Sequence, residues 1–310
     1  MSYIRIDNLW VRYGKLVAVH GISFEIPKGE VFGFIGPNGA GKSSTMKVLA
    51  TLMSPTSGAA YIDGINVAKH PFTIRKRIGY VPDFFGVYED LSVNEYLHFF
   101  AAAYRIPRAR RQRIVDDVLA LTDLTQKHDS QVDALSRGMK QRLGLARVLM
   151  HEPDVLLLDE PASGLDPRAR IEMRELLKEL RNMGKTIIIS SHILHELSQF
   201  STRIGIIEQG KLIAEGSLNE IYAQLGLRRI IHVQVAVVHD ALVQQIEQIP
   251  GVASVERQTD RLAIRLDESA LPVEELLERL VEMGAKVRMF QPEVMDMETA
   301  FMKLTEGKTA

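Results

Sequence analysis

Residues 36 to 44 read Gly36-Pro37-Asn38-Gly39-Ala40-Gly41-Lys42-Ser43-Ser44, and this glycine-rich stretch decides the fold of the chain. It follows the apolar run 31–35, which predicts a buried strand, and precedes residues 45–49, which predict a helix. A strand before the loop and a helix after it distinguish a P-loop from an ordinary glycine-rich turn. Glycines let successive N–H groups point at one phosphate, and the start of a helix adds partial positive charge. The stretch therefore predicts a nucleoside triphosphate site.

Individual residues of this loop have distinct expected roles. Lys42 is long enough to reach the outer phosphates, and the Ser43 hydroxyl suits Mg²⁺. The remaining contacts with the nucleotide are expected from Gly36, Asn38, Gly39, Ala40, Gly41 and Ser44.

Composition bounds the possible classes of protein. The chain has 310 residues, enough for two domains, and its 46% hydrophobic and 25% charged residues are those of a soluble globular protein. A net charge of −1 gives no electrostatic case for a nucleic-acid partner, and none is expected. There is no cysteine, which excludes disulfides and thiolate metal sites and fits a reducing cytoplasm. The N-terminus lacks the layout of a signal peptide, and no apolar run is long enough to span a bilayer. We therefore expect any role at a membrane to require a partner.

Two carboxylates close a second apolar run, residues 155–160. Such a uniformly apolar strand is typical of a parallel sheet covered by helices, and ligands bind such sheets at the carboxyl ends of the strands. Asp159 is suited to coordinate Mg²⁺, and Glu160 is suited to orient or deprotonate an attacking water. Two acids at the end of a strand are unremarkable alone, but much less so after a P-loop.

The local sequence pattern leaves two interpretations open for each of three further residues. Tyr13 is either a strand-end aromatic or a ring that stacks on a nucleotide base. Ser136 caps either an ordinary helix or a second anion-binding helix start. His192, at the end of the apolar run 186–192, is either structural or a contact to the γ-phosphate. His195 is expected at the surface.

Residues 92–130 predict a helical insert within an α/β domain, opened by a capping box between Ser92 and Glu95. The preceding loop, residues 84–88, is unusually aromatic for a connector. A basic cluster at the start of the second insert helix is expected to be a solvated face, with lipid headgroups or RNA as the alternatives. The cluster consists of Arg108, Arg110, Arg111 and Arg113.

These motifs together resemble those of an ATP-binding-cassette (ABC) ATPase subunit over roughly residues 3–222. They occur in the family's order: the P-loop, the signature-like Leu135-Ser136-Arg137-Gly138, the acidic strand 155–160, the Ser163-Gly164-Leu165-Asp166 D-loop and the switch His192. The resemblance implies a P-loop NTPase fold of the α/β class, with an antiparallel β subdomain and a helical insert. It also implies that Tyr13 is the base-stacking aromatic.

In that family two ATPase domains dimerise head to tail around ATP. The resemblance therefore implies a homodimer in which Ser136 and Gly138 contact the γ-phosphate of ATP held by the opposing subunit. It implies that Lys42 and Ser43 hold ATP and Mg²⁺ in their own subunit, that Glu160 activates water and that His192 senses the γ-phosphate. The expected partner is an integral membrane permease, which would place the chain on the cytoplasmic face of the membrane.

The chain departs from the family pattern at two places. The usual signature is Leu-Ser-Gly-Gly-Gln, whereas here Arg137 and Met139 replace a glycine and the glutamine. Asp83 stands where the family has the glutamine of the Q-loop. A carboxylate there still offers an oxygen to Mg²⁺, but it adds repulsion toward phosphate.

The Val-Pro-Asp Q-loop, the Arg-Gly-Met signature and the C-terminal extension resemble those of ATP-binding subunits of bacterial exporters. In these the membrane subunit is a separate polypeptide, and the family's coupling surface maps onto residues 84–104. The aromatics Phe84, Phe85 and Tyr88 then form either a docking patch or a cluster packed beneath the insert.

The chain changes character after residue 225, so we expect an ATPase domain at 1–225 and a second domain at 226–310. The pattern strand–helix–strand–strand–helix–strand predicts a small α+β ferredoxin-like domain, followed by a helix at 296–304. Nothing in this domain predicts chemistry; related exporters suggest an accessory role in dimerisation or regulation.

The alternative hypotheses for the function are other classes of ABC protein. Ribosome-acting members usually carry two cassettes and DNA-repair members a long coiled coil; this chain has one cassette and no sustained heptads. An importer ATPase is a nearer rival. A cassette that only binds ATP is disfavoured by the intact Lys42, Asp159, Glu160 and His192.

Overall fold

A computed structural model describes residues 2–84, 86, 88, 90–193, 197, 200–217, 220–221, 229–258, 261–267 and 270–293. The chain divides into two compact units between residues 218 and 219, and each is described by itself. Several expected features lie outside the described residues: Phe85, His195, the domain boundary at 225 and the final helix at 296–304.

The first unit is built on a six-stranded sheet with the strand order β10-β9-β3-β8-β7-β6. Neighbouring strands from β9 to β6 run parallel, and β10 pairs antiparallel with β9. The strands are β3 (Val31–Ile35), β6 (Ile78–Val81), β7 (Val155–Asp159), β8 (Thr186–Ser191), β9 (Arg203–Glu208) and β10 (Lys211–Gly216). Strands β3, β7 and β8 are buried along their whole length, as the apolar runs predict.

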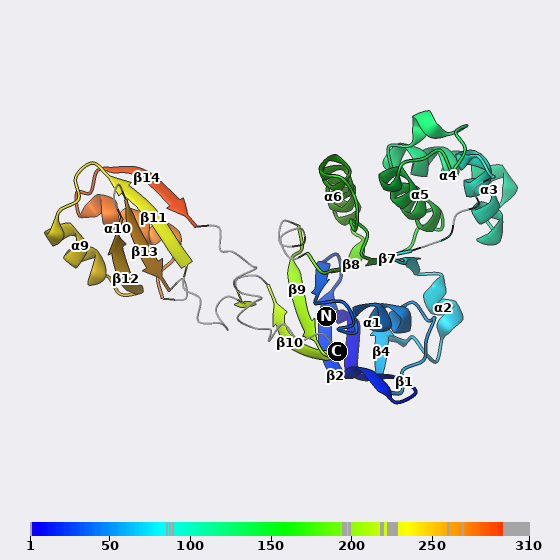
Figure 1. Cartoon of the computed structure of the whole chain (residues 1–310), viewed down its shortest axis with the longest axis horizontal. Helices are drawn as coiled ribbons and strands as arrows, with labels where there is room; N and C mark the ends of the chain where they lie inside the picture. The colour runs from blue at the N-terminus through cyan, green and yellow to red at the C-terminus, as the bar shows by residue number, and fades with distance from the viewer. Residues whose placement is uncertain are drawn as a thin grey trace. The chain divides into compact units, whose positions relative to one another are not determined.

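A second, antiparallel sheet with the order β2-β1-β4-β5 forms the expected β subdomain. Its strands are β1 (Ser2–Tyr13), β2 (Leu16–Pro27), β4 (Ser57–Ile62) and β5 (Ile65–Asn66). One hydrophobic cluster joins this sheet to helix α1 (Lys42–Leu49) and to one face of the six-stranded sheet. The cluster includes Met46 and Leu49 of α1, and Leu157 and Ile188 of the six-stranded sheet. Figure 1 shows α1 beside β4.

The remaining helices of this unit include the expected insert. Helices α3, α4 and α5 contact one another and lie together in Figure 1. The capping box between Ser92 and Glu95 is present at the start of α3, as predicted. The helices are α2 (Pro71–Arg75), α3 (Val93–Ala103), α4 (Arg108–Leu121), the 3₁₀ helix η1 (Thr125–Lys127), α5 (Arg137–Leu149) and α6 (Pro167–Asn182).

The second unit has the predicted ferredoxin-like order. Its sheet runs β12-β13-β11-β14 with every neighbouring pair antiparallel, so the first and third strands lie at the centre. Helices α9 and α10 contribute Leu242, Ile246, Leu276 and Leu280 to a core of its own. The elements are β11 (Arg229–Val235), α9 (Asp240–Glu247), β12 (Val252–Arg257), β13 (Leu262–Leu266), α10 (Val273–Glu282) and β14 (Val287–Pro292).

The sequence pattern also predicts a strand at 78–83 that ends at a proline, and a strand at 231–238. The first ends at Val81 because Pro82 has no N–H to donate to a ladder. The strand expected to reach Val238 ends at Val235, since His239 caps α9 by accepting a hydrogen bond from Leu242 N at 3.0 Å. None of the helices in the described ranges combines the length and apolar composition that crossing a membrane requires.

A buried arginine fixes the end of the insert against the rest of the first unit. Arg142 of α5 donates to Thr122 O at 3.2 Å and to Asp123 Oδ2 at 3.0 Å, just after α4. Its other Nη lies 3.4 Å from Glu172 of α6. Only 8% of the Arg142 side chain is exposed, so these charge-assisted contacts are screened less than surface pairs.

We predict that Arg142→Met lowers the free energy of unfolding of the first unit by about 2 kcal/mol, because it removes charge-assisted hydrogen bonds from a buried site. Trp10 is the single tryptophan of the chain and lies in β1, so its fluorescence during urea unfolding reports on this unit.

The matched control is Arg113→Met. Arg113 is 88% exposed and lies 3.8 Å from Asp117, so its loss should change stability by less than about 0.5 kcal/mol. Equal effects of the two substitutions would contradict the role of Arg142.

Candidate functional site

The glycine-rich loop joins β3 to the first turn of α1, as predicted. Gly41 has a φ of 104°, in the left-handed region that favours glycine, and a Cβ there would meet Ala18 O at 2.5 Å. Asn38 and Gly39 are exposed, whereas Gly36, Ala40 and Gly41 are buried. Ser43 and Ser44 follow Lys42 in the first turn of α1, so their hydroxyls and the first N–H groups of the helix lie together at the end of the loop.

The side chain of Lys42 folds back onto this loop, and only 5% of the residue is exposed. Its Nζ donates to Gly36 O at 2.7 Å and to Pro37 O at 3.1 Å, and lies 3.6 Å from Glu160 Oε1. Burial lowers the pKa of Lys42, and the charges of Glu160 and Asp159 oppose that shift. The ammonium is thus held between backbone carbonyls and the acid pair.

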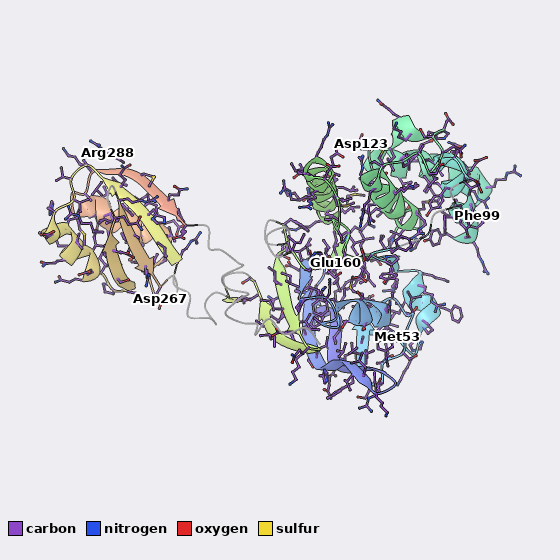
Figure 2. The ribbon with its side chains drawn as sticks, in the orientation of Figure 1. Met53, Phe99, Asp123, Glu160, Asp267 and Arg288 are labelled. Atoms are coloured by element: carbon purple, nitrogen blue, oxygen red, sulfur yellow. The ribbon has the colours of Figure 1, made fainter. Side chains whose placement is uncertain are left out.

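The acid pair lies where β7 ends. Asp159 is 3% exposed and accepts a hydrogen bond from Ser190 Oγ of the neighbouring strand β8. Glu160 has a φ of 52°, a left-handed conformation that is uncommon outside glycine. Its N–H donates to both Ser190 O (3.2 Å) and Ser190 Oγ (3.0 Å). Figure 2 marks the position of Glu160 within the first unit.

The structure brings His192 and Tyr13 to the same region. His192 follows β8, and its Nδ1 lies 2.8 Å from Glu160 Oε2. Lys42, Glu160 and His192 therefore form one chain of contacts. The Tyr13 hydroxyl lies 3.3 Å from Ser44 Oγ, while 43% of the residue stays exposed. This places an aromatic ring beside the start of α1.

Asp83 lies in the loop after β6 and is exposed. Burial raises the pKa of Tyr80, and the negative charges of Asp159 and Asp83 raise it further. The Tyr80 hydroxyl is buried and has no hydrogen-bond partner among the described residues.

Ser136 and Gly138 lie at the start of α5, and among the described residues neither of them contacts the P-loop. Ser136 Oγ accepts from Met139 N at 3.3 Å, so the predicted N-cap is present. A Cβ on Gly138 would meet Ala169 Cβ of α6 at 2.9 Å. The guanidinium of Arg137 lies directly against Gly164 of the D-loop, so the two motifs touch within one chain.

Sequence reasoning missed Ser190 and the contact of Arg137. Ser190 Oγ donates to the Asp159 carboxylate and accepts from the backbone N–H of Glu160, but a serine near the end of an apolar strand carries no distinctive signal. Strand register makes it significant, because Asp159 pairs with Ser190 between β7 and β8. Arg137 was recognised only as a departure from the family pattern.

Comparison with known proteins places this site in a family. The family model for ABC transporters matches residues 19–163. Over 310 residues the chain is 32% identical to the linearmycin resistance ATP-binding protein LnrL of Bacillus subtilis (strain 168), and the match covers 99% of each chain. It is 42% identical over 219 residues to the Nod factor export ATP-binding protein I of Burkholderia orbicola (strain AU 1054), covering 70% of this chain and 72% of that protein.

A solved structure of the ATP-binding subunit of an ABC transporter has the same fold. It matches with a TM-score of 0.66 at 32% identity, covering 73% of this chain and 94% of that one. A P-loop, an acid pair and a histidine at one sheet edge form an arrangement for cleaving a phosphoanhydride. Given the full-length relative, the chain belongs to the ABC transporter family, as an ATP-binding and ATP-hydrolysing subunit.

Proposed function

We propose that the chain is the ATPase subunit of an exporter and works as a homodimer on the cytoplasmic face of the membrane. The observation that carries the exporter assignment is a 42% identical relative that is named for Nod factor export. A second relative, named for linearmycin resistance, aligns along both units. We further propose that residues 1–225 are the ATPase domain and that residues 226–310 are an accessory domain for dimerisation or regulation.

The proposed chemistry is carried by Glu160, with Lys42 and His192. Glu160 positions and deprotonates the attacking water, Lys42 stabilises charge on the outer phosphates, and His192 contacts the γ-phosphate. Their contacts support these roles, because Glu160 lies 3.6 Å from the Lys42 ammonium and 2.8 Å from the His192 ring. The P-loop backbone would hold the phosphates, and the Tyr13 ring would stack on the base.

A Mg²⁺ ion fits the oxygen donors at this edge. Magnesium in nucleotide sites takes one or two protein oxygens together with phosphate oxygens and water. We assign Ser43 and Asp159 as its protein partners, with Asp83 as a further oxygen donor. Asp159 ends β7, and Asp83 follows β6, the strand that pairs in parallel with β7, which supports this assignment. When bound, the ion would neutralise charge on the outer phosphates.

Ser190 is proposed to position the acid pair. Its hydroxyl donates to Asp159 and accepts from the backbone N–H of Glu160 at 3.0 Å. One side chain thus fixes both the direction of the Asp159 carboxylate and the turn that carries Glu160. This hydrogen bonding helps to hold Glu160 in its left-handed conformation.

The homodimer proposal assigns Ser136 and Gly138 to the ATP bound by the opposing subunit. The geometry that supports it is a helix start capped by Ser136, because the first N–H groups of a helix favour an anion. The contact of Arg137 with Gly164 gives this helix start a direct link to the D-loop.

The aromatic residues near the insert have separate roles in this proposal. Tyr88 packs on the insert: the centroid of its ring lies 5.3 Å from that of Phe99 and 6.4 Å from that of Phe100. Phe84 is 89% exposed, which supports a docking contact with the permease.

We predict that Ser190→Ala lowers kcat for ATP hydrolysis by roughly 10-fold, since it removes the hydrogen bond that orients the Asp159 carboxyl group. Affinity for a non-hydrolysable ATP analogue should change little. Ser191→Ala is the control, because the Ser191 hydroxyl accepts from Ile193 N at 2.9 Å and is not bonded to the acids. Equal losses in both variants would remove Ser190 from the mechanism.

Glu160→Gln is predicted to reduce ATP turnover by at least about 100-fold while ATP stays bound. Light scattering with ATP should then show a doubled mass, and adding Ser136→Ala should return the protein to a monomer. Turnover at the wild-type rate would exclude Glu160 as the base. A dimer that persists in the double variant would exclude Ser136 from the interface.

The exporter proposal is tested by gentle purification of the tagged chain from its native membranes, followed by mass spectrometry. A multispanning membrane protein should co-purify, and Phe84→Ser should lose it while basal ATPase activity is unchanged. Phe72→Ser is the control at another ring, 77% exposed in α2, and should retain the partner. Recovery of ribosomal or DNA-bound proteins instead would overturn the transport assignment.

A further inference from the structure

The hydroxyl group of Tyr80 is a buried polar group that the proposed mechanism does not use. It has no hydrogen-bond partner in the described part of the chain. An unpaired buried donor costs free energy, so native structures keep few of them. Burial raises the pKa of Tyr80, and the charges of Asp159 and Asp83 raise it further, so the hydroxyl stays protonated at physiological pH. Tyr80 therefore holds a hydrogen-bond donor that another arrangement of the site can use.

Strand pairing places Tyr80 beside Asp159. Tyr80 of β6 pairs with Leu157 of the parallel strand β7, and Asp159 lies two residues further along β7. Because side chains alternate between the faces of a sheet, these three residues share one face. Tyr80 and Leu157 both pack in the hydrophobic cluster that includes α1, which identifies that face. Diagonal neighbours on one face of paired strands lie about 7–8 Å apart, within reach of an aromatic side chain.

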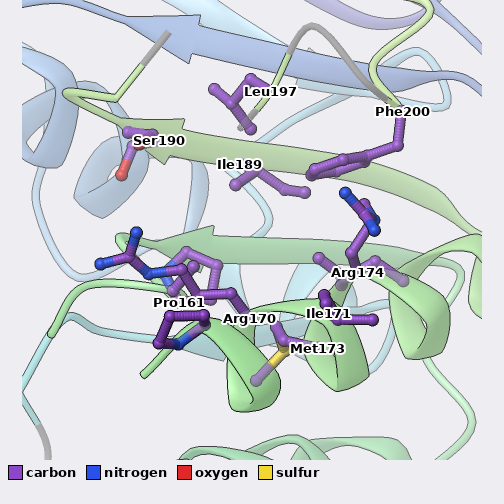
Figure 3. Close-up of a pocket in the computed structure, with 13 residues that line it drawn as sticks. Pro161, Arg170, Ile171, Met173, Arg174, Ile189, Ser190, Leu197 and Phe200 are labelled. Atoms are coloured by element: carbon purple, nitrogen blue, oxygen red, sulfur yellow. The ribbon is translucent and has the colours of Figure 1, made fainter. Parts of the chain in front are cut away.

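Asp159 has a second hydroxyl on its other side. It pairs with Ser190 of β8 and accepts a hydrogen bond from Ser190 Oγ. Ile188, two residues before Ser190, belongs to the cluster that includes α1, whereas Ile189 lines a cavity against α6 on the opposite face (Figure 3). Ser190 and Tyr80 thus flank the Asp159 carboxylate from the two neighbouring strands. Only the serine of these two residues is bonded to it.

We propose that Tyr80 is a positioning residue for Asp159, and that its hydroxyl donates a hydrogen bond to the Asp159 carboxylate when ATP and Mg²⁺ are bound. This inference rests on the proposed role of Asp159 as a partner of the ion. Carboxylates that bind a metal are themselves held by hydrogen bonds, which fix their direction. With Ser190 on one side and Tyr80 on the other, the Asp159 carboxylate keeps a single direction.

Lys42 links the new hydrogen bond to nucleotide binding. Its ammonium lies 3.6 Å from Glu160, and the charges of Glu160 and Asp159 oppose the lowering of its pKa by burial. When Lys42 turns to the outer phosphates, the acid pair loses this neighbouring positive charge. A hydrogen bond from Tyr80 to the ionised Asp159 offsets part of that loss. The Tyr80 hydroxyl therefore gains its acceptor as the site is loaded.

The test uses Tyr80→Phe, which removes the hydroxyl and leaves the ring in the hydrophobic cluster. Mn²⁺, a paramagnetic substitute for Mg²⁺, is titrated into the full-length chain with a non-hydrolysable ATP analogue, and electron paramagnetic resonance counts the free ion. Tyr80→Phe should weaken Mn²⁺ binding roughly 10-fold, while affinity for the analogue without metal is unchanged. Tyr61→Phe is the control and should bind Mn²⁺ like the parent, because Tyr61 lies in β4 of the other sheet.

Thermal unfolding separates positioning from a structural role. Without nucleotide, Tyr80→Phe should melt at the parent temperature or above it, because the variant loses a hydroxyl that has no partner among the described residues. With the analogue and Mg²⁺, it should melt below the parent. Ser190→Ala should melt below the parent under both conditions, because its bond to Asp159 is already present. An equal fall for Tyr80→Phe under both conditions would overturn the inference.

Asp159→Asn separates this inference from the assignment of the ion itself. It should weaken Mn²⁺ binding more than Tyr80→Phe does, since it removes a charge that the ion contacts. Weak binding in Asp159→Asn together with parent-like binding in Tyr80→Phe would overturn the role of Tyr80 and leave the ion assigned to Asp159. Parent-like binding in Asp159→Asn would overturn the assignment of the ion, and the role of Tyr80 with it.

Discussion

The first unit depends on holding one ammonium group away from water. Burying Lys42 lowers its pKa, and the nearby acids and the carbonyls of Gly36 and Pro37 keep the charged form favourable. These partners come from distant parts of the sequence. They meet because β3, β8 and β7 are adjacent and parallel, so their carboxyl ends share one edge of the sheet. The strand order is thus the constraint that assembles the site.

Helix α1 connects this electrostatic arrangement to the core. Thr45, Met46, Val48 and Leu49 are buried, so most of the helix packs between the two sheets. Its first turn, in contrast, carries Lys42 and the serines of the P-loop. Core packing therefore fixes the direction in which the N–H groups of the loop point. A loop on a loosely packed helix would lose that direction.

Much of the fold was predictable because its signals are local. The P-loop, the acidic strand, the capping box at Ser92 and the alternation in the second unit each depend on neighbouring residues. The aromatic loop shows the limit of such signals. Phe84 and Tyr88 are both aromatic residues of one short loop, but Phe84 is exposed whereas Tyr88 packs against Phe99. Ser190 could not be recognised without strand register, and the contact of Arg137 with Gly164 requires the tertiary fold. Local pattern gives the elements, whereas pairing and packing decide which side chains meet.

The left-handed backbone of Glu160, together with the role in hydrolysis that we propose for it, sets stability against activity at this position. A glycine adopts such a φ without steric cost, while a side chain there costs on the order of 1 kcal/mol. Backbone geometry alone favours glycine at this turn, whereas the role that we propose for Glu160 requires a carboxylate. An inactive descendant of this chain, freed from hydrolysis, would be expected to lose Glu160 early and to become more resistant to unfolding as it did so.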